Sequence, residues 1–424
     1  MFKPKVVKLG NMKVVLVKTD KQSIVVEAMI GSGSREEKAN VGGVAHFLEH
    51  MCGRGTVSFP GPNDLGVAVD WVGGARNAYT SHEDMGFWTR TAKEKFDLAL
   101  KIVSEQVRSA LLPEDQIEKE RTIIAEEFKM YEDDPSSKSS DVVWSTLFGK
   151  SGLGRPVLGS TKSLQAITRD DLLNFRATHF KADNTILGVV GDWDDDDDKL
   201  INAISLSFGD YVDSKLDIKR DKLDQNKLGL GQKKLIKRKV DQAHLSIALP
   251  TITALDERRY ALSMLNIILG SSWSSRLYKE IRLKRGLAYS IGSGYNLMLD
   301  AGAFFIGGGI SKNALKPTYE LIGQILADMA SGSGEFCLTK DDLAMARECY
   351  KGRVSFSFDS PEKVMSAALG DISCGREIRT ADDIKAAIDK ITLDDLNQLA
   401  NELFVFEKAT VAVVGDFKSI DDAL

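Results

Sequence analysis

The chain has 424 residues, of which 43% are hydrophobic and 28% are charged. This composition is typical of a globular protein that is long enough for more than one hydrophobic core. The formal net charge is -5, and no block of Lys and Arg stands out, which argues against a nucleic-acid partner.

Targeting signals are also absent from the sequence pattern. No apolar run approaches the ~18 residues of a membrane-spanning helix, and the first ten residues lack the apolar core of a secretory signal. The four cysteines are scattered without a Cys-x-x-Cys pair, which favours free thiols over a disulfide framework. We therefore expect a cytoplasmic protein without a membrane partner.

The regular elements can be followed along the chain. A strand is predicted at residues 23–30, and helical patterns follow at 93–110 and 113–131. Strands that alternate with helices in this way predict an α+β fold, in which helices pack on one face of a sheet.

Residues 43–51, Gly-Val-Ala-His-Phe-Leu-Glu-His-Met, contain the pattern His-x-x-Glu-His. In a helix, residues four apart share a face, so His46 and His50 would present two imidazoles to one ion. Two histidines and a carboxylate suit zinc and leave one position open for a water, whose pKa the ion lowers toward about 7. Glu49 would then take the proton of this water as general base. The alternative is that both histidines are core residues with satisfied hydrogen bonds.

The third ligand should be a distant carboxylate, and the predicted helix at 116–131 offers two. Glu120 and Glu127 fall within its apolar stripe, two turns apart on nearly the same face. A carboxylate in such a stripe needs a partner. For Glu127 the better partner is a metal. For Glu120 the choices are an ion pair with Lys119 or Arg121, or a hydrogen bond that orients a histidine ligand.

An internal repeat divides the chain into two halves. The segment Ile-Thr-Arg-Asp-Asp-Leu at 167–172 recurs as Ile-Thr-Leu-Asp-Asp-Leu at 391–396, and both copies end in Val-Val-Gly-Asp, at 189–192 and 413–416. The offset is 224 residues throughout, from 167 to 391 and from 189 to 413. Each copy predicts a helix with a threonine cap followed by an apolar strand. We infer two homologous halves.

The boundary between the halves is expected in the polar, Lys- and Asp-rich stretch at 210–233. The predicted organisation is therefore a zinc-binding domain at 1–209, a linker at 210–233, and a homologous domain without metal ligands at 234–424.

At this point the sequence resembles the pitrilysin and mitochondrial-processing-peptidase family, the inverted zincins. The resemblance rests first on His-Phe-Leu-Glu-His at 46–50, which is followed by 76 intervening residues and then Glu127. Further motifs agree: Gly-Gly-Ala-Arg-Asn-Ala-Tyr-Thr-Ser at 73–81, Glu-Arg at 120–121, Ser-Ser-Arg-Leu-Tyr at 274–278, and Arg282 with Tyr289 seven positions later. The length resembles the shorter, two-domain members.

The resemblance implies two related α+β sandwiches with mostly antiparallel sheets and one zinc ion per chain. Paired short subunits of the family enclose a chamber in which unfolded or short peptides are cleaved. We therefore expect peptide substrates and a homodimer, or a heterodimer with a related subunit.

The resemblance also assigns residues to the substrate. The peptide would add as a strand to an edge formed by Asn77, Ala78, Tyr79 and Thr80, where main-chain hydrogen bonds provide affinity. Arg282 and Tyr289 would act catalytically by stabilising the developing oxyanion. The alternative for Arg282 is a surface ion pair with Glu280.

Two functional hypotheses follow. The first is a zinc endopeptidase with Glu49 as the base. The second is a non-catalytic or partner-dependent assembly subunit on the same fold, against which the intact ligand set and the presence of Arg282 and Tyr289 argue.

Overall fold

The computed structural model describes residues 3–193, 196–217, 220 and 222–424 of the chain. They divide into two compact units. Unit 1 contains Met1–Phe128, Arg155–Asp221 and Ser357–Thr380, and unit 2 contains Lys129–Gly154, Lys222–Phe356 and Ala381–Leu424. The chain enters unit 2 for residues 129–154, returns to unit 1, and enters unit 2 again at residue 222, inside the predicted linker. It returns to unit 1 once more for residues 357–380. The units therefore differ from two continuous domains, because each half lends one segment to the other unit.

Unit 1 is built on a mixed sheet of six strands in the order β1-β2-β6-β3-β5-β4. Only β2 and β6 are parallel, and the other neighbours are antiparallel. The predicted strand at 23–30 is β3, near the middle of the sheet. The strands are β1 (Lys3–Leu9), β2 (Met12–Lys18), β3 (Ser23–Ile30), β4 (Ala75–Thr80), β5 (Met85–Ala92) and β6 (Thr185–Gly191).

One face of this sheet carries the main helical layer, as predicted. Val26, Ala28 and Ile30 of β3 belong to the larger core of unit 1, together with buried residues of α1, α3, α7 and α8. The helices of unit 1 are α1 (Val44–Cys52), α2 (Asp64–Asp70), α3 (Phe96–Arg108), α4 (Glu114–Asp133), α6 (Thr161–Ala166), α7 (Arg169–His179), α8 (Asp197–Phe208) and α12 (Pro361–Ser373). Helix α4 continues into unit 2 at residue 129.

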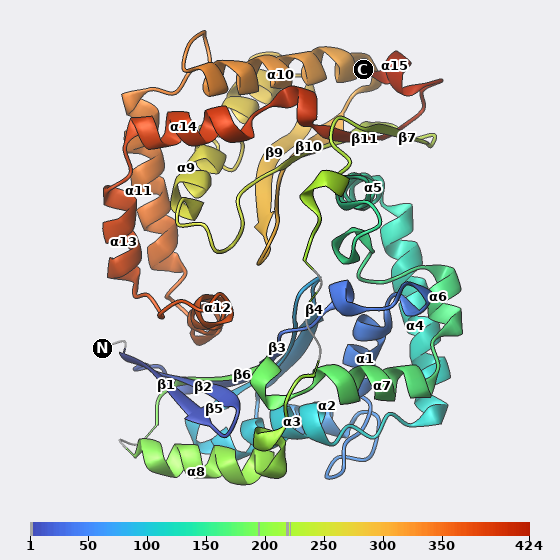
Figure 1. Ribbon diagram of the computed structural model, residues 1–424, viewed down its shortest axis with the longest axis vertical. Coiled ribbons are helices and arrows are strands. Elements are labelled where there is room, and N and C mark those ends of the chain that lie inside the picture. Colours follow the sequence, from blue (N-terminus) through green and yellow to red (C-terminus); the bar gives the residue numbers. More distant parts are fainter. Residues whose placement is uncertain (1–2, 194–195, 218–219, 221) are drawn as a thin grey trace. The chain divides into compact units, whose positions relative to one another are not determined.

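The other face of the sheet is covered by α12, which comes from the second half of the sequence (Figure 1). Val25 and Met29 of β3 share a core with Met365 and Leu369 of the helix. A Cβ at Gly188 in β6 would lie 2.1 Å from Met365 Sδ, so glycine at this position lets α12 approach the sheet.

Unit 2 repeats this plan with a sheet of five strands in the order β7-β11-β8-β10-β9. Its parallel pair, β7 with β11, corresponds to β2 with β6, and β7 is the edge strand because unit 2 has no counterpart of β1 among its described strands. The strands are β7 (Lys233–Lys237), β8 (Ala243–Pro250), β9 (Ala288–Leu297), β10 (Gly302–Ile310) and β11 (Thr410–Gly415). The order matches unit 1 strand by strand from β2 onward, which confirms the inference of two homologous halves.

Helices also lie on both faces of the second sheet. Trp144 and Leu147 of α5 pack on the small residues Ala248 and Ala412, whereas Phe304 on the opposite face contacts Phe404 after α14, with ring centroids 5.4 Å apart. The helices of unit 2 are α5 (Pro135–Phe148), α9 (Arg259–Leu269), the π-helical turn η8 (Tyr278–Leu283), α10 (Leu315–Ser331), α11 (Lys340–Phe356), α13 (Ala381–Asp389), α14 (Leu393–Leu403) and α15 (Ile420–Ala423).

The repeated sequence produces the same local structure in both units. The side chains of Thr168 and Thr392 each accept a hydrogen bond from the backbone N–H three residues later, that of Asp171 or Asp395. The side chain of the same aspartate accepts a hydrogen bond from the backbone N–H of the threonine, which completes a capping box. The predicted threonine caps are thus confirmed.

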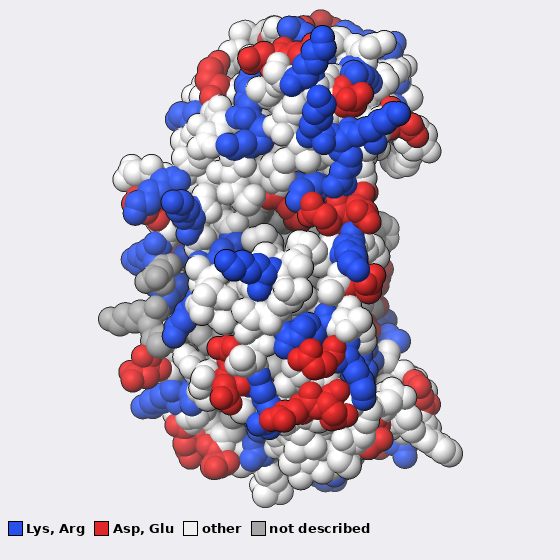
Figure 2. Space-filling model, turned by 90° about the vertical axis from the view of Figure 1, so that its right-hand side faces the viewer, with Lys and Arg blue, Asp and Glu red and all other residues white. Residues whose placement is uncertain are grey.

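The distribution of surface charge and the polarity of the helices indicate which kinds of partner the described residues could bind. Basic and acidic side chains are interspersed over the face shown in Figure 2, so this face presents no broad field of one sign. Among the described residues, no helix combines the length and the low polarity that are needed to cross a bilayer.

Candidate metal centre

Helix α1 carries the His-x-x-Glu-His pattern, and a buried carboxylate fixes its beginning. The first residue before the helix is Gly43, with φ of 93°, where a Cβ would lie 2.7 Å from the carbonyl oxygen of Leu158. The side chain of Glu37 accepts hydrogen bonds from the backbone N–H of Gly43 at 2.8 Å and of Ala45 at 2.9 Å. Glu37 therefore accepts hydrogen bonds from backbone N–H groups that have no partner within the helix at its start.

The three predicted ligands lie together in unit 1. The Nε2 atoms of His46 and His50 are each 3.7 Å from the same carboxylate oxygen of Glu127, Oε2. The ligand atoms of all three residues lie within 4.8 Å of one another. The spacing of four residues brings the two imidazoles to one face of α1, and α4 supplies the carboxylate from across the core.

The hydrogen bonding of His46 argues against a satisfied core histidine. The residue is buried, and its Nδ1 has no hydrogen-bond partner in the part of the chain that the structure describes. Its Nε2 is too far from Glu127 for a hydrogen bond. Burial lowers the pKa of His46 to about 3, so the ring is neutral and has a lone pair to donate.

The donor set and its spacing fit zinc. Tetrahedral ligands at 2.0–2.1 Å from an ion lie roughly 3.3 Å apart, slightly closer than the 3.7 Å between the histidine nitrogens and Glu127 Oε2. A small inward movement of side chains would complete three ligands and leave a fourth position open. Two imidazoles and one carboxylate are also the set found in catalytic zinc sites.

Glu120 orients the second histidine. Its Oε2 lies 3.0 Å from His50 Nδ1, which directs the Nε2 lone pair of His50 toward Glu127. Its other oxygen, Oε1, lies 2.5 Å from Arg54 Nε, and only 2% of the side chain is exposed. Burial alone would raise the pKa of Glu120, but the contacts with His50 and Arg54 outweigh it and lower the pKa below its usual value. The ion-pair partner of Glu120 is thus Arg54, not Lys119 or Arg121.

Glu49, the predicted base, is tied to the edge of the sheet. Thr80 Oγ1 in β4 donates a hydrogen bond of 2.6 Å to Glu49 Oε2. Burial raises the pKa of Glu49 above its ordinary value, and the hydrogen bond from Thr80 opposes this rise. A carboxylate in this environment is a better proton acceptor near neutral pH than an exposed glutamate.

The predicted substrate strand is at a free edge of the first sheet. Strand β4 is the last strand in the order and, among the residues that the structure describes, pairs with β5 alone. Its side chains alternate: Asn77 and Tyr79 are exposed, whereas Ala78 and Thr80 are less exposed and lie on the face that packs near α1. Its outer backbone groups are therefore not used within the sheet.

The two residues predicted from the second half meet each other in unit 2. The guanidinium of Arg282, in η8, lies over the rings of Tyr278 and Tyr289, 5.2 and 5.4 Å from their centroids. Tyr289 is 74% exposed. Glu280, the alternative partner of Arg282, instead pairs with Lys284 and Arg285.

Three contributions were not foreseen from the sequence. Arg54 as the partner of Glu120, Thr80 as the donor to Glu49, and Glu37 as the cap of α1 all depend on contacts between separate segments.

Comparison with known proteins identifies the family. The model of the insulinase family, peptidase family M16, matches residues 13–161, and the model described as the peptidase M16 inactive domain matches residues 166–348. An uncharacterized zinc protease of Bacillus subtilis is 30% identical over 394 residues, which cover 92% of this chain and 93% of the relative. A second uncharacterized zinc protease, from Streptomyces coelicolor, is also 30% identical and covers 91% of this chain and 83% of its own length. The chain belongs to peptidase family M16.

Solved structures show the M16 fold over nearly the whole chain. A protease from Helicobacter pylori superimposes with a TM-score of 0.87 at 21% identity, covering 98% of this chain and all of its own. An M16 inactive domain from Pseudomonas fluorescens gives a TM-score of 0.89 at 19% identity, with 98% of each chain covered. A chain of complex III from Candida albicans gives a TM-score of 0.80 at 18% identity, over 99% of this chain and 97% of that one. At such identities the likeness concerns the fold alone.

The two M16 models divide the predicted site residues. The part matched by the insulinase model contains His46, Glu49, His50 and Glu127, whereas the part matched by the inactive-domain model contains Arg282 and Tyr289. The candidate ligands and the candidate base therefore lie in the part of the chain that the insulinase model matches.

Proposed function

We propose that the chain is a zinc-dependent metallopeptidase that hydrolyses unfolded or short peptides, with His46, His50 and Glu127 as ligands. The proposal rests on one observation above all. The two histidine nitrogens approach the same oxygen of Glu127 at 3.7 Å without a hydrogen bond, although His46 is buried. Burying such groups without partners is unfavourable, and a metal ion removes the penalty.

Each residue of the site has a task in peptide hydrolysis. A bound zinc ion supplies Lewis acidity, which polarises the peptide carbonyl and makes water a better nucleophile. Glu49 accepts the proton of the attacking water and passes it to the leaving amine. Thr80 holds one oxygen of Glu49 and leaves the other for this task. Glu120 keeps His50 in the tautomer whose Nε2 can bind the ion.

The substrate is proposed to bind as an added strand along β4. The outer backbone groups of Asn77, Ala78, Tyr79 and Thr80 would pair with the main chain of the peptide, so that affinity depends little on the peptide sequence. A folded protein cannot present such a segment, which accounts for a preference for unfolded or short peptides. Thr80 would bring the added strand next to Glu49.

Arg282 and Tyr289 are proposed to assist in a chamber formed by two paired subunits, either identical or related. The exposed ring of Tyr289 and the guanidinium of Arg282 present one hydroxyl and one cation from the same surface of unit 2. Such groups can stabilise the negative charge that develops on a peptide carbonyl oxygen during hydrolysis.

The test is the variant Glu49→Gln, measured for zinc content and for cleavage of an unstructured peptide. We expect about one zinc per chain, as in the unmodified protein, and a fall in kcat of at least about 100-fold, which is typical for loss of a general base. Glu114→Gln is the matched control, because it makes the same change at an exposed position at the start of α4. Normal cleavage by Glu49→Gln would refute the mechanism.

A partner-dependent subunit is the alternative outcome of the same experiment. The fold does not decide between the two, because it also occurs in a chain of complex III. Zinc binding by the purified chain without cleavage, followed by cleavage when a related subunit is added, would establish the partner-dependent form. Failure to bind zinc after reconstitution would refute the ligand assignment.

A further inference from the structure

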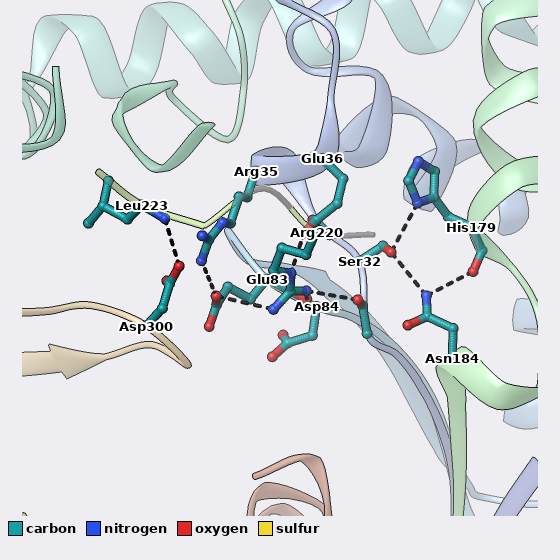
Figure 3. Close-up of polar contacts among 12 residues, drawn as sticks. Ser32, Arg35, Glu36, Glu83, Asp84, His179, Asn184, Arg220, Leu223 and Asp300 are labelled. Carbon is teal, nitrogen blue, oxygen red and sulfur yellow. Dashed lines mark hydrogen bonds and ion pairs between the residues drawn. The ribbon is translucent and has the colours of Figure 1, made fainter. Parts of the chain in front are cut away.

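Arg220 belongs to unit 1, close to the point where the chain enters unit 2, and its side chain binds other parts of unit 1. Its Nε donates to Glu36 Oε1 at 2.6 Å, and its Nη1 donates to Glu83 Oε1 at 3.2 Å. Its Nη2 donates to the carbonyl oxygens of Gly31 and Glu83, at 2.9 and 3.1 Å (Figure 3). One guanidinium thus makes four hydrogen bonds through its planar fork, which a lysine could not reproduce.

The acceptors of Arg220 belong to two segments that are packed together. One is the loop that follows β3, and the other is the turn at residues 81–84 between β4 and β5. The backbone N–H of Ser34 donates to the carbonyl of Ser81 at 3.1 Å. A Cβ at Gly33 would lie only 2.3 Å from the same carbonyl oxygen, so the loop approaches the turn as closely as a glycine allows.

Arg220 supplies one of two guanidinium groups that compensate the carboxylates in this contact. Arg35 Nη1 also donates to Glu83 Oε1, at 2.6 Å, so two guanidinium groups face the carboxylates of Glu36 and Glu83. The side chains of Arg35, Glu36 and Glu83 are 5, 8 and 12% exposed. Removing Arg220 takes away the cation that Glu36, Glu83 and the neighbouring carboxyl of Asp84 share, which disfavours the observed arrangement.

The turn held by Arg220 leads directly into the proposed substrate strand. It is closed by a hydrogen bond of 2.8 Å from Ser81 N–H to the carbonyl of Asp84. Thr80, the last residue of β4, immediately precedes it and donates to Glu49. The position of the turn therefore determines the position of the end of β4 that lies beside the general base.

Residues just after the boundary at 221–222 make a similar contact within unit 2. The backbone N–H of Leu223 donates to Asp300 Oδ2 at 2.8 Å (Figure 3). Gln225 Nε2 donates to the carbonyl of Asp300 at 3.1 Å. Asp300 lies in the turn between β9 and β10, the strands that correspond to β4 and β5. In each unit, residues next to the boundary at 221–222 thus bind the turn of the hairpin at the free edge of the sheet: Arg220 in unit 1, and Leu223 and Gln225 in unit 2.

We propose that Arg220 is a positioning residue for substrate binding: by holding the turn at residues 81–84, it keeps β4 in the geometry that receives the peptide. Arg220 touches neither the ligands nor Glu49, so its effect is exerted through the turn. The inference rests on the proposed role of β4 in a peptidase.

The experiment compares Arg220→Ala with the unmodified protein by peptide-cleavage kinetics and by amide hydrogen exchange. We expect the Michaelis constant KM to rise about tenfold, the effect of losing one or two charge-assisted hydrogen bonds, while kcat changes less than threefold and zinc content stays the same. Exchange at residues 75–84 should become at least about tenfold faster, whereas exchange in α3 should not change. Lys222→Ala is the matched control, since it removes one exposed cation of the same segment.

Arg220→Lys makes the test independent of gross unfolding. It retains the charge but loses the fork, and we expect effects in the same direction that are smaller than those of Arg220→Ala. Unchanged exchange at residues 75–84 in both variants, or an effect of equal size in Lys222→Ala, would overturn the inference. If the unmodified protein binds zinc but cleaves no peptide, the proposed function fails, and hydrogen exchange alone still decides whether Arg220 holds β4.

Discussion

A buried carboxyl in the first sheet leads to a quantitative prediction about pH and stability. Glu27 lies in β3 between β6 and β5, and the residue is 8% exposed. Burial raises its pKa from 4.5 to about 7, and nearby Asp84 adds to the rise. The hydroxyl of Tyr79 donates to Glu27 Oε1 at 3.1 Å and opposes the rise without cancelling it.

The sign of the effect follows from proton binding. The folded state holds the proton of Glu27 more tightly than the unfolded state. Below pH 4.5 the carboxyl is protonated in both states and does not lower the free energy of unfolding. This free energy falls as pH rises from 4.5 through about 7, where the folded state also loses the proton. Each unit of pKa difference between the two states corresponds to about 1.4 kcal/mol. The rise from 4.5 to about 7 therefore lowers the free energy of unfolding above pH 7 by about 3 kcal/mol. Glu27→Gln removes the ionisation but keeps an oxygen that can accept from Tyr79.

The expected result is a pH-dependent gain in stability for Glu27→Gln. Between pH 5 and pH 8, its free energy of unfolding should increase relative to that of the unmodified protein by about 2 to 3 kcal/mol. Urea denaturation at a series of pH values measures the difference directly. Glu94→Gln, at an exposed position after β5, is the control and should show no such trend. A difference that is the same at pH 5 and pH 8 would refute the reasoning.

Further predictions concern the metal centre and its helix. Glu120→Gln should lower zinc affinity about 10- to 100-fold, because His50 loses the anion that orients it; competition with a chelator measures this, and exposed Glu114→Gln should bind zinc normally. Arg54→Ala should lower zinc affinity by a smaller factor in the same assay, since Glu120 remains, and an effect larger than that of Glu120→Gln would contradict this order. Glu37→Ala should lower the free energy of unfolding by about 1 to 3 kcal/mol, because two buried backbone N–H groups lose their acceptor; an unchanged urea midpoint would show that α1 needs no such cap.

Local patterns in the sequence determined the elements that contain the site. The spacing of His46 and His50 places both on one face of any helix, whatever surrounds it. The apolar stripe of α4 singled out Glu127 and Glu120 as carboxylates directed inward. The repeated threonine caps predicted two helices and two strands that the structure contains. These features depend on residues within a few positions of one another, where helix and strand geometry is regular.

Tertiary structure decided which separate segments meet. The exchange of α5 and α12 between the units, the contact of Arg54 with Glu120, the hydrogen bond from Thr80 to Glu49 and the binding of Arg220 to the turn after β4 all join residues far apart in the chain. Such contacts depend on how whole elements pack, and a charged or polar side chain has many partners of equal chemistry in the sequence. Local sequence patterns therefore identify the candidate ligands and base, whereas the packing of whole elements selects the residues that hold them in place.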